Sequence, residues 1–191
     1  MQSGLTANRV QGTAIGAMVA AGFGMGWFFW SLSEMHRVTM GTAIGVELGA
    51  VALLAPAVYV ARQAKRWPRI ADDPAMGRRF AWINAIQWAA IVMVVFGFSR
   101  LHFEAYVAPA VTAIVGLHYL PLAPLFHFRM HYATGAVLVC WAALSALLFS
   151  REEVLVLAAM GTGLILWVSA AMMLVMAMRR MAAETELAGQ Q

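Results

Sequence analysis

Residues 107–131 read VAPAVTAIVGLHYLPLAPLFHFRMH, and this stretch decides the fold class. It is long and apolar enough to cross a bilayer, which takes about 20 apolar residues. It also contains His118 and three prolines, Pro109, Pro121 and Pro124, the last two just beyond His118. Each proline removes a backbone donor that lipid cannot replace. We therefore expect a membrane-spanning helix that is bent or broken just beyond His118, with His118 buried among other helices.

The composition of the whole chain is that of a polytopic membrane protein. Its 191 residues are 62% hydrophobic and 12% charged, and the charges fall in short patches between long apolar runs. Because the net charge of +4 lies beside hydrophobic segments, anionic lipid headgroups are the expected partner, and nucleic acid is not. The single cysteine, Cys140, excludes an intrachain disulfide and a multi-thiolate zinc site. The preference for arginine over lysine favours a bacterial source, and hence a bacterial cytoplasmic membrane.

Six runs of the sequence reach spanning length, so we predict one integral membrane domain, an all-α bundle of six transmembrane helices. The first run is too long for a signal peptide, whose apolar region is about 7–15 residues, and we expect it to be a retained span. Residues 62–79 form the one hydrophilic loop. The predicted spans are residues 10–32, 38–61, 80–98, 107–125, 132–149 and 154–178.

The distribution of arginine and lysine predicts the orientation of these spans. With the N-terminus inside, the cytoplasmic ends carry ten of the 13 basic residues, and the positive-inside rule then places both termini in the cytoplasm. His127 and His131 alternate with arginine at the exit of the fourth span and extend this basic surface, which suits lipid headgroups or a specific anion. The basic residues expected to contact anionic lipid are Arg62, Lys65, Arg66, Arg69, Arg78, Arg79 and Arg129.

Small residues recur every fourth position in the first two spans. The first span has them at Gly12, Gly16, Ala20 and Gly24, and the second span has them at Gly41, Gly45 and Gly49. Such spacing lets helix backbones approach closely in lipid. We expect helix packing along both ridges, and the same ridges could join two copies of the chain in a homo-oligomer.

Glu47 lies about nine residues into the second predicted span, near the middle of the membrane. A carboxylate at that depth costs several kcal/mol unless it is protonated or paired. Glu47 is about 200° around the helix from the glycine ridge, which suits a helix that packs on one side and lines a polar cavity on the other. The alternative is a protonated acid that bonds to a neighbouring helix and has a structural role.

Further polar residues lie at similar positions in other spans. His118 is followed by Tyr119 in the fourth span, and Asn84 and Gln87 are three residues apart in the third, hence on one helix face. We take these four residues, with Glu47, as candidates for handling a substrate or a proton. For His118 the alternative is a satisfied core histidine.

Two acidic and imidazole clusters are predicted on the outer side. One contains Glu34 and His36, and the other contains His102 and Glu104. Carboxylate and imidazole together suit zinc or another divalent metal, although short polar turns often contain such residues. No cofactor is predicted.

Residues 114–123, IVGLHYLPLA, followed by YATG at residues 132–135, resemble a group of small six-span bacterial integral membrane proteins. That group has no established activity, so the resemblance implies the class of protein and no mechanism.

Polar groups on at least three spans favour a small secondary transporter or channel-like protein over an enzyme, because each such group is costly in lipid. Two alternatives stay open. The same residues could hold helices together in a non-catalytic membrane partner or assembly subunit. A membrane-embedded metal hydrolase could be built on the outer clusters. The sequence contains no phosphate-binding glycine loop and no nucleophile turn of a serine hydrolase.

Overall fold

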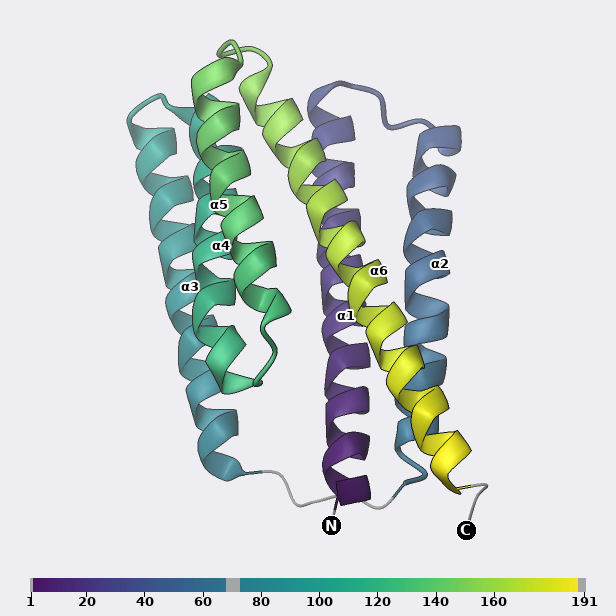
Figure 1. The fold of residues 1–191 in the computed structure, drawn as a ribbon. Helices are drawn as coiled ribbons and strands as arrows, with labels where there is room; N and C mark the ends of the chain where they lie inside the picture. Colours follow the sequence, from purple (N-terminus) through teal and green to yellow (C-terminus); the bar gives the residue numbers. More distant parts are fainter. Residues whose placement is uncertain (1, 68–72, 189–191) are drawn as a thin grey trace. The chain divides into compact units, whose positions relative to one another are not determined.

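A computed structural model describes residues 2–67 and 73–188, with side chains for residues 7–67 and 73–186. Within these residues the chain is all-α, as predicted, and contains six α-helices and no strand (Figure 1). A short 3-10 turn, η1 (Glu104–Tyr106), precedes the fourth helix. The helices are α1 (Gln2–Glu34), α2 (Met40–Ala64), α3 (Pro74–Arg100), α4 (Val107–Leu125), α5 (Met130–Leu148) and α6 (Val154–Ala188).

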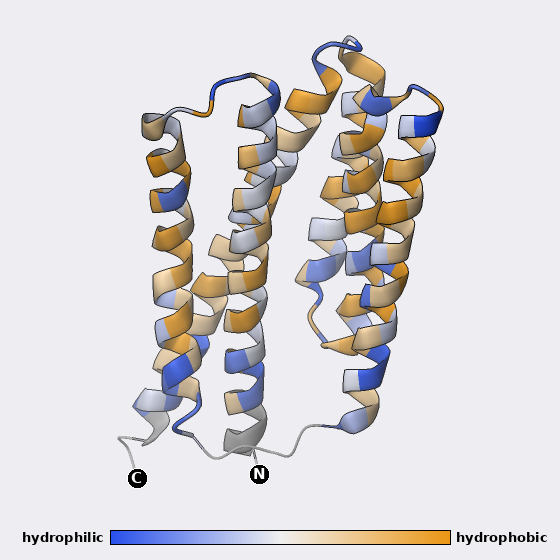
Figure 2. Cartoon of the chain, turned by 180° about the vertical axis from the view of Figure 1, so that it is seen from behind, coloured by the Kyte–Doolittle hydropathy of each residue, from blue (hydrophilic) through white to orange (hydrophobic). Residues whose placement is uncertain are grey.

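Each of the six helices is long and apolar enough to cross a membrane, which confirms the six predicted spans and a multi-pass membrane protein. Hydrophobic residues dominate the helices along most of their length, and hydrophilic residues gather toward the ends and in the turns (Figure 2). The helix ends differ from the predicted spans where polar sequence continues a helix into water. The clearest case is α6, which continues beyond the predicted end at Met178 to Ala188.

Local capping explains where α3 begins. The Asp73 side chain accepts a hydrogen bond from the Ala75 amide at 2.8 Å, and Pro74 occupies the first position of the helix. A proline costs nothing there, because its missing N–H has no intrahelical partner in the first turn. The sequence Asp73-Pro74 therefore starts the helix six residues before the predicted span at Phe80.

The fourth span was predicted to be bent or broken beyond His118, and the break is wrong, because α4 is a continuous helix through Pro121 and Pro124. The helix ends only at Leu125, where the Phe126 amide still donates to the Leu122 carbonyl at 3.0 Å and His127 takes a positive φ of 51°. Both prolines fall within the last five residues of the helix. They remove the donors that would bond to the carbonyls of Leu117 and Leu120, yet the helix continues through both prolines.

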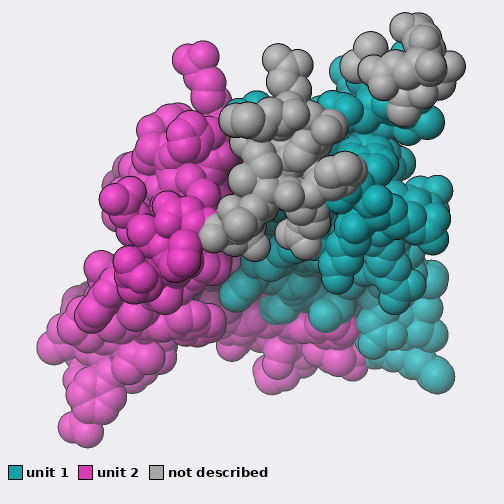
Figure 3. Space-filling model, turned by 90° about the horizontal axis from the view of Figure 1, so that it is seen from below, with its two compact units in different colours: residues 1–26, 39–71, 166–191 teal, residues 27–38, 72–165 magenta. Residues whose placement is uncertain are grey.

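The described chain divides into two compact units (Figure 3). Unit 1 comprises residues 1–26, 39–71 and 166–191, and unit 2 comprises residues 27–38 and 72–165. Unit 1 therefore contains α2 with parts of α1 and α6, and unit 2 contains α3, α4 and α5 with the remaining parts of α1 and α6.

In unit 1, Trp167 of α6 joins three helices. Its indole N–H donates to the Ala21 carbonyl of α1 at 3.0 Å. Its ring covers Gly49 of α2, where an added Cβ would collide with the indole. A large aromatic ring that packs on a glycine gives close van der Waals contact between helices. Membrane helices associate through such packing, because lipid supplies no hydrophobic force between them.

The predicted small-residue ridges are packed only in part. Gly49 lies under Trp167, and a Cβ on Gly16 would lie 3.4 Å from the Met173 sulfur. At Gly12 and Gly45, however, an added Cβ would meet no atom within 4 Å, and at Gly41 only the nearby Thr39 hydroxyl, at 3.9 Å. The prediction of helix packing along the whole of both ridges is therefore wrong at these three positions, because all three glycines, Gly12 of α1 and Gly41 and Gly45 of α2, are exposed.

Unit 2 is organised around α4, which packs against both α3 and α5. The Thr112 hydroxyl of α4 lies 2.7 Å from the Thr162 hydroxyl of α6, and both threonines are buried. Trp141 of α5 covers Gly161 of α6 and donates to the Ala158 carbonyl at 3.1 Å. No described residue of α3 is buried, so α3 lies against α4 on one side and exposes the rest of its surface.

Candidate functional site

The candidate site lies in unit 2 and is positioned by the contact between α4 and α5. These helices approach most closely at Gly116 and Gly135, where an added Cβ on either residue would lie within 3 Å of the other residue's carbonyl oxygen. His118 and Tyr119 follow Gly116 on α4, and His131 lies one turn before Gly135 on α5. The glycine contact therefore brings the three side chains into one region of unit 2.

The His118 side chain of α4 is half-buried and contacts α3. Its ring makes a backbone hydrogen bond with Ile83 of α3. Its Nδ1 atom is buried and has no hydrogen-bond partner among the described residues. A buried polar atom without a partner costs roughly 1–3 kcal/mol, so such an atom calls for an explanation. His118 was predicted to be buried among other helices, and it is only half-buried, with its ring toward α3.

His131 completes an aromatic cluster that sequence reasoning missed. Its side chain is only 8% exposed, although the sequence pattern placed it on a basic surface. Its ring centroid lies 5.3 Å from that of Tyr119, 5.1 Å from that of Phe128 and 6.3 Å from that of Phe126. The signal available in the sequence was the run of aromatic residues on both sides of Arg129.

His118 and His131 interact electrostatically. His118 and His131 lie close enough for their charges to interact, and the Tyr119 ring contacts both, at centroid distances of 6.3 Å and 5.3 Å. Two imidazoles in one apolar region cannot both carry a charge without repulsion.

Asn84 and Gln87 lie on α3, next to the point where His118 meets that helix. Asn84 follows Ile83 directly, and Gln87 lies one turn further on the same face as Ile83. Both side chains are half-buried, and the Asn84 amide donates to the Phe80 carbonyl of its own helix at 3.0 Å. The structure thus brings His118, Asn84 and Gln87 to the region between α3 and α4, whereas Tyr119 lies on the side of α4 that faces α5, beside His131 and Gly135.

Glu47 does not share this unit. It lies on α2 in unit 1, and its side chain is exposed. Seven residues separate it from Met40, the first residue of α2, which corresponds to about 10 Å along the helix axis. The prediction that Glu47 lines a polar cavity finds no support in unit 1.

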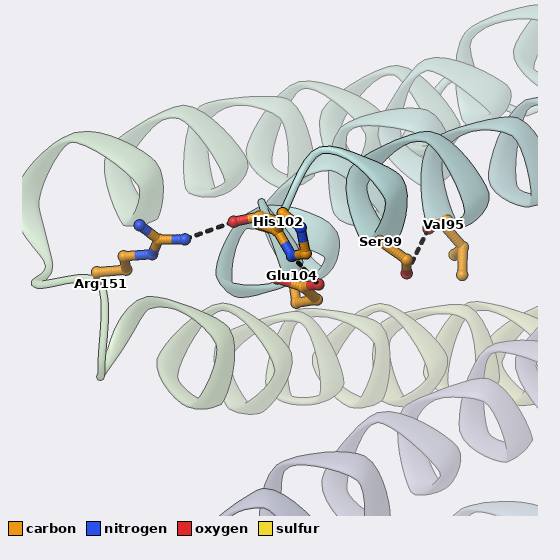
Figure 4. Close-up of polar contacts among 5 residues, drawn as sticks. All are labelled: Val95, Ser99, His102, Glu104 and Arg151. Carbon is orange, nitrogen blue, oxygen red and sulfur yellow. Dashed lines mark hydrogen bonds and ion pairs between the residues drawn. The ribbon is translucent and has the colours of Figure 1, made fainter.

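The outer clusters do not assemble a metal site. His102 and Glu104 approach each other, with Nδ1 3.9 Å from Oε1, but their side chains are 89% and 56% exposed (Figure 4). Arg151 donates to the His102 carbonyl, and Glu34 accepts a hydrogen bond from the Trp30 indole at 3.2 Å. Among the described residues, no group of three His, Cys, Asp or Glu side chains could hold a metal ion. Among the described residues Glu34, His36, His102 and Glu104 therefore do not form the metal site that their residue types suggested.

The predicted cytoplasmic basic residues are exposed wherever the structure describes them. In unit 1 they follow one another at the end of α2, and in unit 2 they lie at the start of α3 and in the turn before α5. Arg69 lies outside the described residues. The exposed residues are Arg62, Lys65, Arg66, Arg78, Arg79 and Arg129.

No known protein family, no curated protein and no solved structure matches this chain. The resemblance of residues 114–123 to a group of small bacterial membrane proteins therefore stays a prediction.

Proposed function

We propose that this chain is a small secondary transporter or channel-like protein of the bacterial cytoplasmic membrane. In this proposal a polar path runs between α3 and α4, and His118 is its proton- or substrate-handling group. Asn84 and Gln87 line the path beside it, and Tyr119 supports His118 from the side of α4 that faces α5. The observation that carries the proposal is the buried Nδ1 atom of His118, which has no hydrogen-bond partner among the described residues.

Two physical arguments support this assignment. Polar side chains inside a span are costly, and in membrane proteins they often mark the pathways of ions, protons or substrates. Imidazole is also the side chain whose ordinary pKa lies nearest neutral pH, so it gains and loses protons under physiological conditions. A buried ring nitrogen beside Tyr119 and His131 gives a transported proton or a donor group on a substrate a place to bind.

The competing function is a non-catalytic membrane partner or assembly subunit. The backbone hydrogen bond between His118 and Ile83 favours it, because an interhelical bond alone is a sufficient reason for a polar residue in a span. The two functions differ in what the second ring nitrogen does. In a structural role it contributes nothing further, whereas in transport its protonation is required.

A membrane-embedded metal hydrolase lacks support, because the Glu and His residues of the two outer clusters do not provide three metal ligands within the described chain.

Proton flux into vesicles tests the proposal. The purified protein is reconstituted into vesicles that contain a pH-sensitive dye, and a potassium diffusion potential drives protons across the membrane. We expect flux above that of empty vesicles, and we expect His118→Gln, which cannot be protonated, to reduce it to the empty-vesicle rate. His127→Gln is the matched control, because His127 is exposed in the turn after α4. Unchanged flux in a folded His118→Gln variant would refute the role of His118.

The arginines and Lys65 on the predicted cytoplasmic side are the expected contacts with lipid headgroups. We propose that they bind anionic headgroups, each contributing about 1 kcal/mol near a charged surface. Replacing Arg78 and Arg79 together with glutamine should weaken the preference for anionic lipid in a binding assay. Replacing Arg151, which is predicted on the outer side, should leave that preference unchanged.

A further inference from the structure

The hydrogen bond between His118 and Ile83 determines which ring nitrogen can take up a proton. The Nδ1 atom has no hydrogen-bond partner among the described residues, so Nε2 makes this bond. Ile83 lies well inside α3, where its backbone N–H already donates within the helix, so its carbonyl accepts from the ring. A neutral imidazole has only one N–H, and Nε2 therefore carries it. A proton that binds to His118 binds at the lone pair of Nδ1.

The helices that form the site offer no carboxylate to a protonated His118. None of α3, α4 and α5 contains an aspartate or a glutamate. Asp73 caps its own helix and precedes Ile83 by ten residues, which is about 15 Å along the axis of α3. Glu47 belongs to unit 1, and α2 is not one of these helices. The other described acidic residues of unit 2 lie in turns or at helix ends on the predicted outer side, and they are Glu34, Glu104, Glu152 and Glu153.

The charged groups on these helices and in the turn between α4 and α5 are all basic. On α5, His131 interacts electrostatically with His118. The arginines are Arg78 and Arg79 near the start of α3, Arg100 at its end and Arg129 before α5. The other titratable side chains of α4, α5 and this turn are Tyr119, His127, Tyr132 and Cys140. Because a protonated His118 meets only like charges on these elements, an opposite charge from a ligand would stabilise it.

We propose that the site at His118 binds a small monovalent anion together with a proton. The proton binds to the Nδ1 lone pair, and the resulting N–H donates to the anion. The anion offsets the charge of the imidazolium and its repulsion from His131. It must be small, because α3 and α4 pack against each other here.

This inference rests on the function proposed above, since it names the class of ligand that the path at His118 takes. The anion is a ligand of the site, in addition to the proton that the path conducts. Halides, nitrate and small carboxylates have the required charge and accept hydrogen bonds.

Proton uptake that accompanies anion binding tests the inference. Purified protein is held in detergent at pH 7 in weak buffer with a pH-sensitive dye. Potassium gluconate, whose anion is too large for the site, is replaced by potassium chloride, nitrate or formate at constant ionic strength. This pH lies above the ordinary pKa of imidazole, about 6.5, so most free imidazoles start without the second proton. We expect at least one of the three anions to raise the pH and to saturate at up to about one proton per chain.

His118→Gln should remove this uptake, because an amide binds no proton at pH 7. His127→Gln is the matched control and should behave as wild type, since His127 is exposed in the turn after α4. The melting temperature of the wild-type protein is a second measurement that needs no variant. The anion should raise it more at pH 6 than at pH 8, because it binds the protonated state and stabilises the fold by its binding.

Three results would overturn the inference. The first is an absence of proton uptake with all three anions, the second is equal uptake by His118→Gln, and the third is an equal rise in melting temperature at both pH values. Failure of the proposed function looks different. Proton flux that requires His118 but shows no anion-linked uptake would remove the anion alone, whereas anion-linked uptake at His118 without any flux would remove the transport function alone.

Discussion

Gly116 of α4 and Gly135 of α5 meet backbone to backbone. A Cβ added to Gly116 would lie 2.8 Å from the Gly135 carbonyl oxygen, and a Cβ added to Gly135 would lie 2.6 Å from the Gly116 carbonyl oxygen. Neither carbonyl can yield without moving its helix. This contact sets the separation of the two helices that carry His118 and His131.

Gly116→Ala and Gly135→Ala should therefore each destabilise the protein, by about 1–3 kcal/mol, the usual cost of overpacking a closely packed site. Thermal unfolding in detergent measures the change as a lower melting temperature. Gly97→Ala on α3 is the matched control, since a Cβ there would meet no atom within 4 Å. Equal melting temperatures for Gly116→Ala, Gly97→Ala and wild type would contradict the close contact.

Trp167 should matter through its hydrogen bond as well as its size. Trp167→Phe keeps a ring over Gly49 but loses the N–H that donates to the Ala21 carbonyl, so we expect a loss of about 1 kcal/mol in unfolding free energy. Trp88→Phe is a suitable comparison, because Trp88 is exposed on α3. If both variants unfold at the same temperature, the bond to Ala21 contributes nothing measurable.

The buried threonine pair predicts energetic coupling between α4 and α6. The Thr112 and Thr162 hydroxyls lie 2.7 Å apart, and each is also within bonding distance of a carbonyl of its own helix. Two protons serve three contacts, so one hydroxyl donates to the other only by giving up its own helix. A double-mutant cycle with Thr112→Val and Thr162→Val should give a coupling energy of about 0.6 kcal/mol. Strictly additive effects would show that the hydroxyls do not bond to each other.

The six helices were predictable because length and apolar composition are sufficient to define a span. Helix ends were less predictable, because a helix can continue beyond its apolar segment into water. The polar residues of α6 after Met178 continue the helix in this way. The effect of Pro121 and Pro124 was overestimated. Each proline leaves one carbonyl of the preceding turn without its intrahelical donor, but α4 stays continuous through both and ends one residue after Pro124.

The candidate site was predictable only as a set of residue types. Periodicity identifies the polar residues, but which face of α5 packs against α4 depends on the glycine contact at Gly116 and Gly135, which involves two separate helices. His131 was consequently assigned to the surface, although it is buried. Glu47 was grouped with His118 by its expected depth, whereas the two residues belong to different units.

The central claim is a polar path between α3 and α4 at His118, and the most direct test is the access of water to Gln87. Gln87→Cys and Val92→Cys, each in the Cys140→Ser background, are exposed to a membrane-impermeant thiol reagent from the cytoplasmic side. Gln87 is half-buried on the face of α3 that meets His118, whereas Val92 is exposed on α3 and lies in its apolar surface. We predict rapid labelling of Gln87→Cys and none of Val92→Cys. Labelling of Gln87→Cys as slow as that of Val92→Cys would contradict a water-accessible path.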